Sequence, residues 1–137
     1  MNTDKRPMQN GLLAAPWAAW VMLALWSAGI WFVNTRSRVF SIGQAATDYV
    51  LYQAGHFFGH VVLGLLAMRA STLTWGWRKG AWVALAGALA HAVLDELAQL
   101  FVPSRHANLE DIVYNMAGVL VGSVALLVMR QRGRTRS

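Results

Sequence analysis

Four long apolar stretches constrain this chain more than any other feature of its sequence. They cover residues 12–33, 49–68, 81–102 and 112–129, and only the third contains charged residues, Asp95 and Glu96. A helix needs about 20 mostly apolar residues to cross the hydrocarbon core of a bilayer. A spanning segment must also satisfy its own backbone hydrogen bonds, so each stretch should be a helix. The sequence therefore predicts an all-α, polytopic membrane protein: a single domain over residues 1–137 built as a four-transmembrane-helix bundle.

Composition excludes the main alternatives to a membrane protein. Only 13% of the residues are charged and 56% are hydrophobic, whereas a soluble domain has about 25% charged residues. The same apolar content excludes intrinsic disorder. The chain has no cysteine, which excludes disulfides, thiolate metal sites and a cysteine nucleophile. The first stretch is longer than the ~7–15-residue apolar core of a signal peptide, so we expect it to be retained as a membrane anchor.

The distribution of basic residues predicts the orientation in the bilayer. Nine of the 12 lysines and arginines lie before the first stretch, between the second and third, or after the fourth; only Arg36, Arg38 and Arg105 lie in the other two connections. Basic residues in short connections are retained on the cytoplasmic side. Both termini should therefore be cytoplasmic. We interpret residues 130–137 as a basic cytoplasmic tail facing anionic lipid, and we expect no nucleic-acid partner.

Polar residues within the stretches gather in the half that this topology turns outward. Residues spaced by three, four, seven or eight share a helix face, and this spacing places polar side chains in one stripe on each of the last three stretches. Each stripe continues into small residues, such as Gly64, Gly118 and Gly122, a pattern that permits close helix packing. We expect the stripes to meet in a polar pocket open to the outer face. Its candidate ligand-binding residues are His56, His60, His91, Asp95, Glu96, Gln99, Arg105, Asp111 and Asn115.

Arg105 is the candidate residue expected to pair with negatively charged groups. An ionised side chain at the bilayer centre costs about 2.5–3.5 kcal/mol on insertion scales, so the carboxylates should face other polar groups rather than lipid. Arg105 is the only cation near Asp95, Glu96 and Asp111 in the sequence. Its guanidinium group suits a phosphate or a carboxylate of a ligand. Glu96 is turned about 100° from Asp95 around the helix, so the two carboxylates need not share a target.

A spaced motif links the third and fourth stretches. It reads Asp-Glu-x-x-Gln-x-Phe-Val-Pro-x-Arg from Asp95 to Arg105, and Asp-Ile-x-x-Asn-x-x-Gly-x-x-x-Gly from Asp111 to Gly122. This spacing resembles the signature of the VanZ-like membrane proteins. His56-Phe57 followed by Leu63-Gly64 likewise resembles the second-helix motif of that family, and the resemblance covers about residues 50–125.

This chain differs from the usual VanZ-like pattern at a few positions, and the resemblance also implies a location and a function. Members commonly carry Asp-Lys where this chain has Tyr52-Gln53, and an aromatic residue where it has His60. The missing lysine removes a cation from the expected pocket. The family implies a multi-pass protein of the bacterial inner membrane, linked in its founding member to lowered susceptibility to the lipoglycopeptide teicoplanin. We therefore expect binding of the head group of a lipid-linked cell-envelope precursor or of an amphiphilic glycopeptide, and no cofactor.

Two other functions remain open on the sequence. In the first, the protein is an intramembrane enzyme, with Asp95 or Glu96 as general acid or base, aided by His56 or His91, on a lipid head-group bond. A metal-dependent variant would use His56 and His60 at i and i+4, but no glutamate lies between them to act as base, so we expect no metal. The catalytic residues are otherwise unknown.

In the second, the chain is a non-catalytic assembly or regulatory subunit. The polar residues would then only hold the outer helix ends together. Asn108, Glu110 and Asp111 lie where they could cap the fourth helix, which would explain their polarity without a ligand. The small-residue stripes also allow a homo-oligomer within the lipid bilayer.

Overall fold

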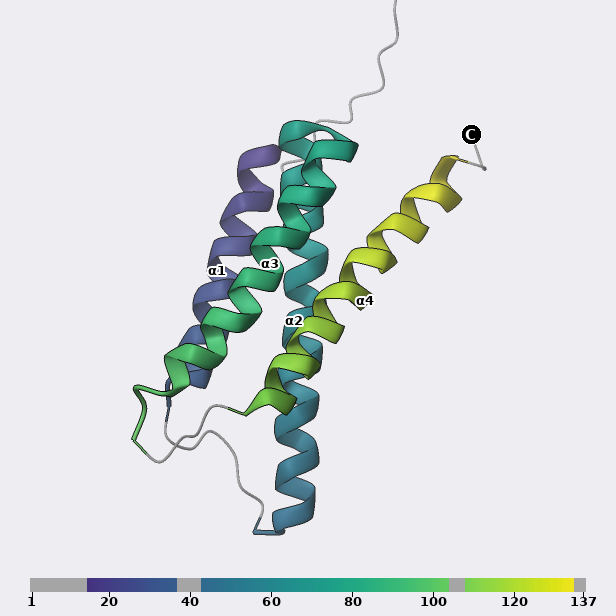
Figure 1. The fold of residues 1–137 in the computed structure, drawn as a ribbon. Coiled ribbons are helices and arrows are strands. Elements are labelled where there is room, and N and C mark those ends of the chain that lie inside the picture. Colours follow the sequence, from purple (N-terminus) through teal and green to yellow (C-terminus); the bar gives the residue numbers. More distant parts are fainter. Residues whose placement is uncertain (1–14, 37–42, 104–107, 135–137) are drawn as a thin grey trace, which may run out of the picture.

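The computed structural model describes residues 15–36, 43–103 and 108–134, and their regular structure is entirely helical (Figure 1). Helix α1 covers Pro16–Asn34, α2 covers Ala45–Trp75, α3 covers Trp77–Gln99 and α4 covers Leu109–Arg134. Each is long and apolar enough to cross a membrane. The predicted all-α, four-helix architecture is confirmed.

The four helices alternate in direction, so the molecule has two distinct ends (Figure 1). At the first, which we call the turn end, α1 begins, α2 passes into α3 at Gly76, and α4 finishes. At the second, the loop end, residues 35–44 join α1 to α2 and residues 100–108 join α3 to α4. Helices α2 and α4 run in the same direction, and α1 and α3 run opposite to them. The described basic residues near helix termini at the turn end are Arg69, Arg78, Lys79, Arg130 and Arg132.

The helices are longer than the predicted spans in two places. Helix α2 has 31 residues, which makes it about 46 Å long at 1.5 Å per residue, well beyond the ~30 Å hydrocarbon core. Helix α4 continues through Arg134, so most of the segment interpreted as a basic tail is helical. Helix α3 instead stops at Gln99, before Pro103. The hydropathy of the sequence predicts where a helix leaves the hydrocarbon core of the bilayer, not where the helix ends. Arginine, methionine and glutamine are good helix formers, so a helix that contains them can continue beyond the hydrocarbon core.

A single residue, Gly76, turns the chain from α2 into α3. Its φ of 74° and ψ of 172° lie in a region that is essentially restricted to glycine. We expect the Gly76→Ala variant to be less stable by about 1–3 kcal/mol. The change is measured by unfolding the purified protein with sodium dodecyl sulfate in mixed micelles. Gly29→Ala, at a helical position where a Cβ meets nothing within 4 Å, should not be destabilised, and equal losses in both variants would contradict the assignment of strain to Gly76.

Glycines set the close approach of α2 and α4. A Cβ at Gly64 would lie 2.9 Å from the Cα of Val119, and a Cβ at Gly118 or Gly122 would overlap a backbone carbonyl oxygen of α2. The two backbones therefore touch along this stripe, as the spacing of small residues predicts. Towards the turn end α4 leans away from the other helices (Figure 1). The closest contact between α2 and α4 consequently lies in the middle of the bundle and towards the loop end.

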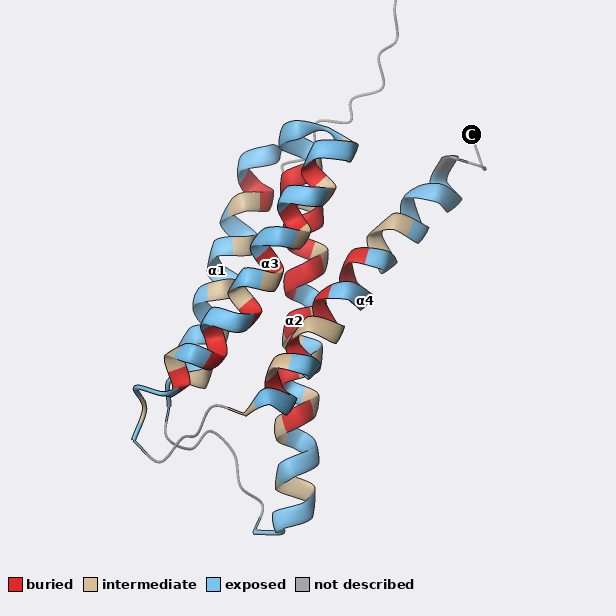
Figure 2. Ribbon diagram, in the orientation of Figure 1, coloured by how far each residue is buried: buried red, intermediate tan, exposed pale blue. Residues whose placement is uncertain are grey.

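Burial is confined to the faces that the helices turn toward one another (Figure 2). An apolar cluster built around Leu63, Ala67, Ala84, Ala88 and Val119 lies between α2, α3 and α4. Most large apolar side chains point outward instead, which suits a protein whose surroundings are lipid. Helix α1 is attached to α2 by two indole groups, since Trp20 Nε1 donates to Thr74 Oγ1 and Trp26 Nε1 donates to the carbonyl oxygen of Gly59, both at 2.9 Å.

Candidate functional site

Two buried hydrogen bonds join polar side chains of α2 and α4 near the loop end. Gln53 Nε2 donates to Asp111 Oδ1 at 2.7 Å, and His56 Nδ1 lies 2.9 Å from Asn115 Oδ1. The amide oxygen can only accept, so the Nδ1 of His56 carries the proton. These pairs lie on the same faces as the glycine stripe. Because the glycines bring the two backbones together, short side chains such as asparagine can reach across.

Helix α3 contributes Asp95 to the same region. Its Oδ2 accepts a hydrogen bond from Asn34 Nδ2 of α1 at 2.6 Å and lies 4.0 Å from Nε2 of His60 on α2. The second distance is too long for a hydrogen bond but short enough for interaction between charges. Asp95 thus connects α3 to both α1 and α2.

Glu96 has different partners from Asp95, as expected from the rotation of about 100° between consecutive residues around a helix axis. Its Oε1 accepts from the backbone N–H of Asn108 at 2.7 Å, and its Oε2 accepts from Gln99 Nε2 at 3.1 Å. Gln99 Oε1 in turn accepts from the hydroxyl of Tyr52 at 3.2 Å. Glu96 therefore attaches the end of α3 to the start of α4, while Asp95 faces α1 and α2.

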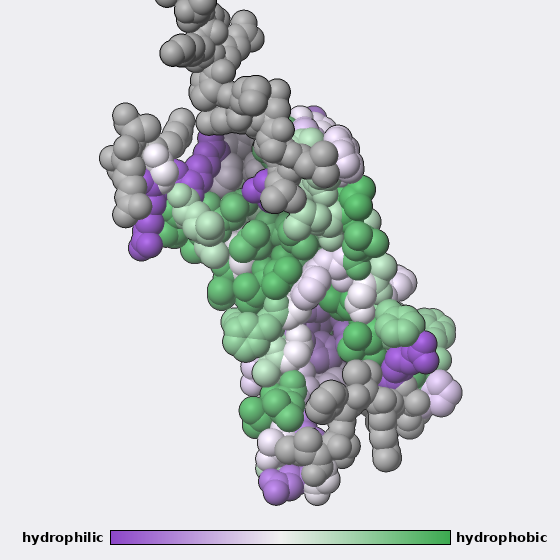
Figure 3. Space-filling model, turned by 180° about the vertical axis from the view of Figure 1, so that it is seen from behind, coloured by the Kyte–Doolittle hydropathy of each residue, from purple (hydrophilic) through white to green (hydrophobic). Residues whose placement is uncertain are grey.

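These side chains form one polar cluster, drawn from all four helices at the loop end. We use the name polar cluster for Asn34, Tyr52, Gln53, His56, His60, Asp95, Glu96, Gln99, Asp111 and Asn115. Glu96, Gln99 and Asn115 are each 0% exposed. Most of the cluster is therefore buried, while Asn34 and Tyr52 are half-buried. That the cluster opens to the outer face stays a prediction. The packing of the helices brings these side chains within hydrogen-bonding distance of one another. Seen from behind, hydrophilic colour is visible in a hollow in the lower half of the molecule (Figure 3).

The polar cluster holds more hydrogen-bonding capacity than the described residues use. Four buried atoms in it have no partner in the described part of the chain: Gln53 Oε1, His56 Nε2, His60 Nε2 and Asn115 Nδ2. All four belong to α2 or α4. A buried polar atom without a partner costs about 1–3 kcal/mol, so a polar group that reached these atoms would be stabilised by them.

His60 of α2 and Asp95 of α3 face each other within the polar cluster. The Nδ1 of His60 lies 2.9 Å from the carbonyl oxygen of His56, which can only accept, so this nitrogen carries the proton. In a neutral ring, Nε2 is then an acceptor facing a carboxylate oxygen 4.0 Å away. Two facing acceptors are favourable only when a proton or a donor group lies between them. A donor group placed between these two atoms would pair with both of them.

The structure brings seven of the nine sequence-predicted residues into the polar cluster. His91 lies beside it, with its ring centroid 5.8 Å from that of His60. Arg105 lies outside the described residues. The capping interpretation applies to Asn108, whose Oδ1 accepts from the backbone N–H of Glu110 at 3.1 Å, whereas Asp111 pairs with Gln53 across the helices.

Sequence reasoning missed three members of the polar cluster: Asn34, Tyr52 and Gln53. Asn34 lies at the end of an apolar stretch that has no other strongly polar residue at its outer end. Tyr52 and Gln53 stand where the resemblance had expected an aspartate and a lysine, and the spacing from Gln53 to His56 and His60 is i, i+3, i+7. That spacing was the available signal. Gln53 supplies a donor to Asp111 without the charge of a lysine.

The arrangement of these side chains also bears on metal binding. Within residues 15–36, 43–103 and 108–134, no three histidine, aspartate or glutamate side chains are placed to hold a metal ion. His56 and His60 lie on one face of α2, and the Nδ1 atom of each has a partner. The described side chains of the cluster can donate, accept and exchange protons.

Four helices of membrane-spanning length, packed around a buried polar cluster, define an all-helical, multi-pass membrane protein. Residues 12–130 match the family model described as VanZ/LLP1, and the chain belongs to this family. The resemblance inferred from the motifs is confirmed and extends into α1. None of the curated proteins and none of the solved structures compared with the chain matches it.

Proposed function

We propose that the polar cluster binds the head group of an amphiphile at the outer face of the bacterial inner membrane, either a lipid-linked cell-envelope precursor or an amphiphilic glycopeptide such as teicoplanin. The observation that supports this proposal is the set of four buried polar atoms without partners on α2 and α4. Their chemistry is mixed, with acceptors on Gln53 and the histidines and a donor on Asn115. Hydroxyl groups of sugars and amide groups of peptides both donate and accept, so they complement such a set.

A purely structural cluster would look different. Helix ends that only need to pack are as stable, or more stable, with apolar residues in place of buried polar groups. Here carboxylates, amides and imidazoles are kept in a region that would otherwise be hydrocarbon. In addition, intramembrane ionisable residues mark functional sites more often than packing sites. Because most of the cluster is buried, ligand binding requires the helix ends around it to separate.

The proposed orientation rests on charge. Of the described basic residues near helix termini, only Arg36 lies at the loop end and the others lie at the turn end. Basic residues in short connections are retained on the cytoplasmic side of a membrane. The loop end and the polar cluster then face outward. In this proposal Arg105, which lies outside the described residues, receives the phosphate or carboxylate of the head group on the strength of its sequence position between α3 and α4.

Binding by purified protein in lipid nanodiscs tests the proposed function. The probes are teicoplanin and a polyprenyl diphosphate carrying a disaccharide. We expect Asn115→Leu and Arg105→Ala to weaken binding of at least one probe by about tenfold or more, since a hydrogen bond to a charged group contributes about 1.5–3 kcal/mol. Ser123→Ala is the matched control, because Ser123 is a buried polar residue of the same helix, outside the polar cluster. Wild-type protein that binds neither probe, or variants that bind as well as the control, would contradict the proposal.

The His60–Asp95 pair favours a second candidate function, acid–base catalysis on a head-group bond. His60 Nε2 faces the Asp95 carboxylate, and the protonated Nδ1 is held by the His56 carbonyl oxygen. This is the arrangement of a base oriented by its other ring nitrogen. The pair differs from the one expected from sequence, in which His56 or His91 assisted the carboxylate. Chromatography of the lipid-linked probe recovered from the binding experiment separates the two functions, because a binding protein returns it unchanged and an enzyme does not.

A further inference from the structure

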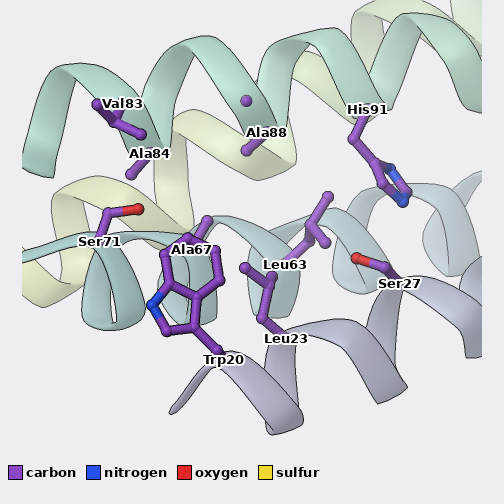
Figure 4. Close-up of a pocket in the computed structure, with 11 residues that line it drawn as sticks. Trp20, Leu23, Ser27, Leu63, Ala67, Ser71, Val83, Ala84, Ala88 and His91 are labelled. Carbon is purple, nitrogen blue, oxygen red and sulfur yellow. The ribbon is translucent and has the colours of Figure 1, made fainter. Parts of the chain in front are cut away.

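A cavity of about 210 Å³ lies between α1, α2 and α3, on the turn-end side of the polar cluster (Figure 4). Small residues leave this space: Ala67 on α2, and Ala84, Gly87 and Ala88 on α3. Trp20 of α1 closes part of it without filling it. The cavity belongs to segments of three helices that are long and apolar enough to lie within a membrane.

The wall of the cavity is apolar over most of its surface. Its polar side chains are Ser71, towards the Trp20 end, and Ser27 and His91, towards the opposite end (Figure 4). Water is retained in a cavity only where each molecule finds two to four polar partners. Apolar cavities of roughly 150 Å³ in soluble proteins stay dry and take up small hydrocarbons such as benzene. The middle of this cavity is therefore suited to hydrocarbon.

His91 connects the cavity to the polar cluster. Both of its ring nitrogens are buried and have no hydrogen-bond partner among the described residues. Its ring centroid lies 5.8 Å from that of His60, which in turn faces Asp95. A molecule that extends from the cavity past His91 would thus pass directly from an apolar environment to the polar cluster.

We propose that this cavity holds the hydrocarbon chain of the amphiphile, with His91 hydrogen-bonded to the first polar group that follows the chain. The inference rests on the proposed function and extends it from the head group to the chain. From Val83 to His91 the wall follows α3 for eight residues, or about 12 Å at 1.5 Å per residue. The site therefore takes one segment of a single chain, and the remainder of a longer chain lies in the bilayer.

Photo-crosslinking with palmitic acid that carries a diazirine at the middle of its chain tests the cavity. The probe is added to nanodiscs containing the full chain, and labelled residues are mapped by mass spectrometry. We expect labelling at Leu63, Ala67 and Ala88, and at least a fivefold decrease at these residues in Gly87→Leu. Gly87 lines the cavity, and a Cβ added to it meets nothing within 4 Å, so a side chain at this position can begin without a backbone clash and take up space at the cavity wall.

Gly29→Leu is the matched control. Gly29 is an exposed helical glycine of α1 whose added Cβ also meets nothing, and it does not line the cavity. The control should be labelled like the wild type. Labelling spread over lipid-facing residues, or equal labelling of the cavity in Gly87→Leu and Gly29→Leu, would overturn the inference. Since palmitic acid lacks the head group, this result is independent of the binding experiments with Asn115 and Arg105 variants.

A second comparison tests the role of His91. In His91→Phe the ring shape is kept and both nitrogens are lost. We expect cavity labelling by the palmitic acid probe to fall at least threefold, while labelling by a diazirine analogue of hexadecane, which has no polar end, stays unchanged. A parallel change for both probes would show that His91 acts only through packing and would overturn its assignment.

Discussion

Replacing Gly122 by alanine should separate α4 from α2 and cost about 3 kcal/mol of stability. The added Cβ would overlap the carbonyl oxygen of Val61 and lie 2.9 Å from its carbonyl carbon and 3.0 Å from the amide nitrogen of Leu65. All three are backbone atoms of a helix, so no side-chain rotation relieves the contact. Overpacking in a well-packed core costs about 1–3 kcal/mol, and a clash with backbone falls at the upper end of this range.

Unfolding by sodium dodecyl sulfate in mixed micelles, followed by tryptophan fluorescence, measures this loss. The matched control is Gly55→Ala on α2, where an added Cβ meets nothing within 4 Å. Alanine in an open helical position should stabilise by about 0.5–1 kcal/mol relative to glycine. If Gly122→Ala were as stable as Gly55→Ala, the close approach of α2 and α4 would be wrong, and with it the distances across the polar cluster.

The second large effect is expected in the His56–Asn115 pair. Substituting Asn115 by leucine leaves the Nδ1 of His56 buried without its acceptor, and His56→Leu does the reverse. Each single variant should lose about 1–3 kcal/mol, the cost of a buried polar group without a partner. The double variant should lose less than the sum of the two, because no unpaired atom remains. The expected coupling is about 1 kcal/mol or more.

The exposed pair of Tyr49 and Glu110 is the control for this double-mutant cycle. It joins the same two helices by a hydrogen bond of 2.7 Å from the tyrosine hydroxyl to Glu110 Oε2, but it is exposed. Exposed polar pairs contribute about 0–1 kcal/mol, so Tyr49→Phe and Glu110→Gln should couple weakly. Equal coupling in the two cycles would show that the polar cluster is as well solvated as the exposed pair, which would remove the main support for the proposed binding function.

Much of the fold could be predicted because the forces that form it act locally along the chain. An apolar stretch of about 20 residues is a helix in a bilayer whatever its neighbours are. The polar stripes could be predicted for a related reason, since residues spaced by i, i+4 and i+8 share a face of any helix. These two regularities predict, without any knowledge of helix packing, which residues share a helix face. They assign His56 and His60 to one face, Asp95 and Gln99 to a second, and Asp111 and Asn115 to a third.

The pairing of those faces could not be predicted in the same way. Asp95 was expected to be assisted by His56 or His91, and the structure places it beside Asn34 and His60. Its expected proximity to Arg105 stays a prediction, because Arg105 lies outside the described residues. The difference depends on how far α1, α2 and α3 slide past one another. That register follows from the contact of Gly80 with the backbone of Ser71 and Thr72, and from the indole bonds of α1.

The sequence by itself determined that this protein has four helices suited to a membrane, that its polar residues gather at one end of them, and that it belongs with the VanZ-like proteins. Only the tertiary structure decided which polar atoms pair, which stay without partners in the described residues, and where a cavity remains between Trp20 and His91. The physical reason is the range of the interactions. Helix formation and face sharing depend on neighbours within a few residues, whereas a hydrogen bond or a void between helices depends on shifts of about one ångström in their packing.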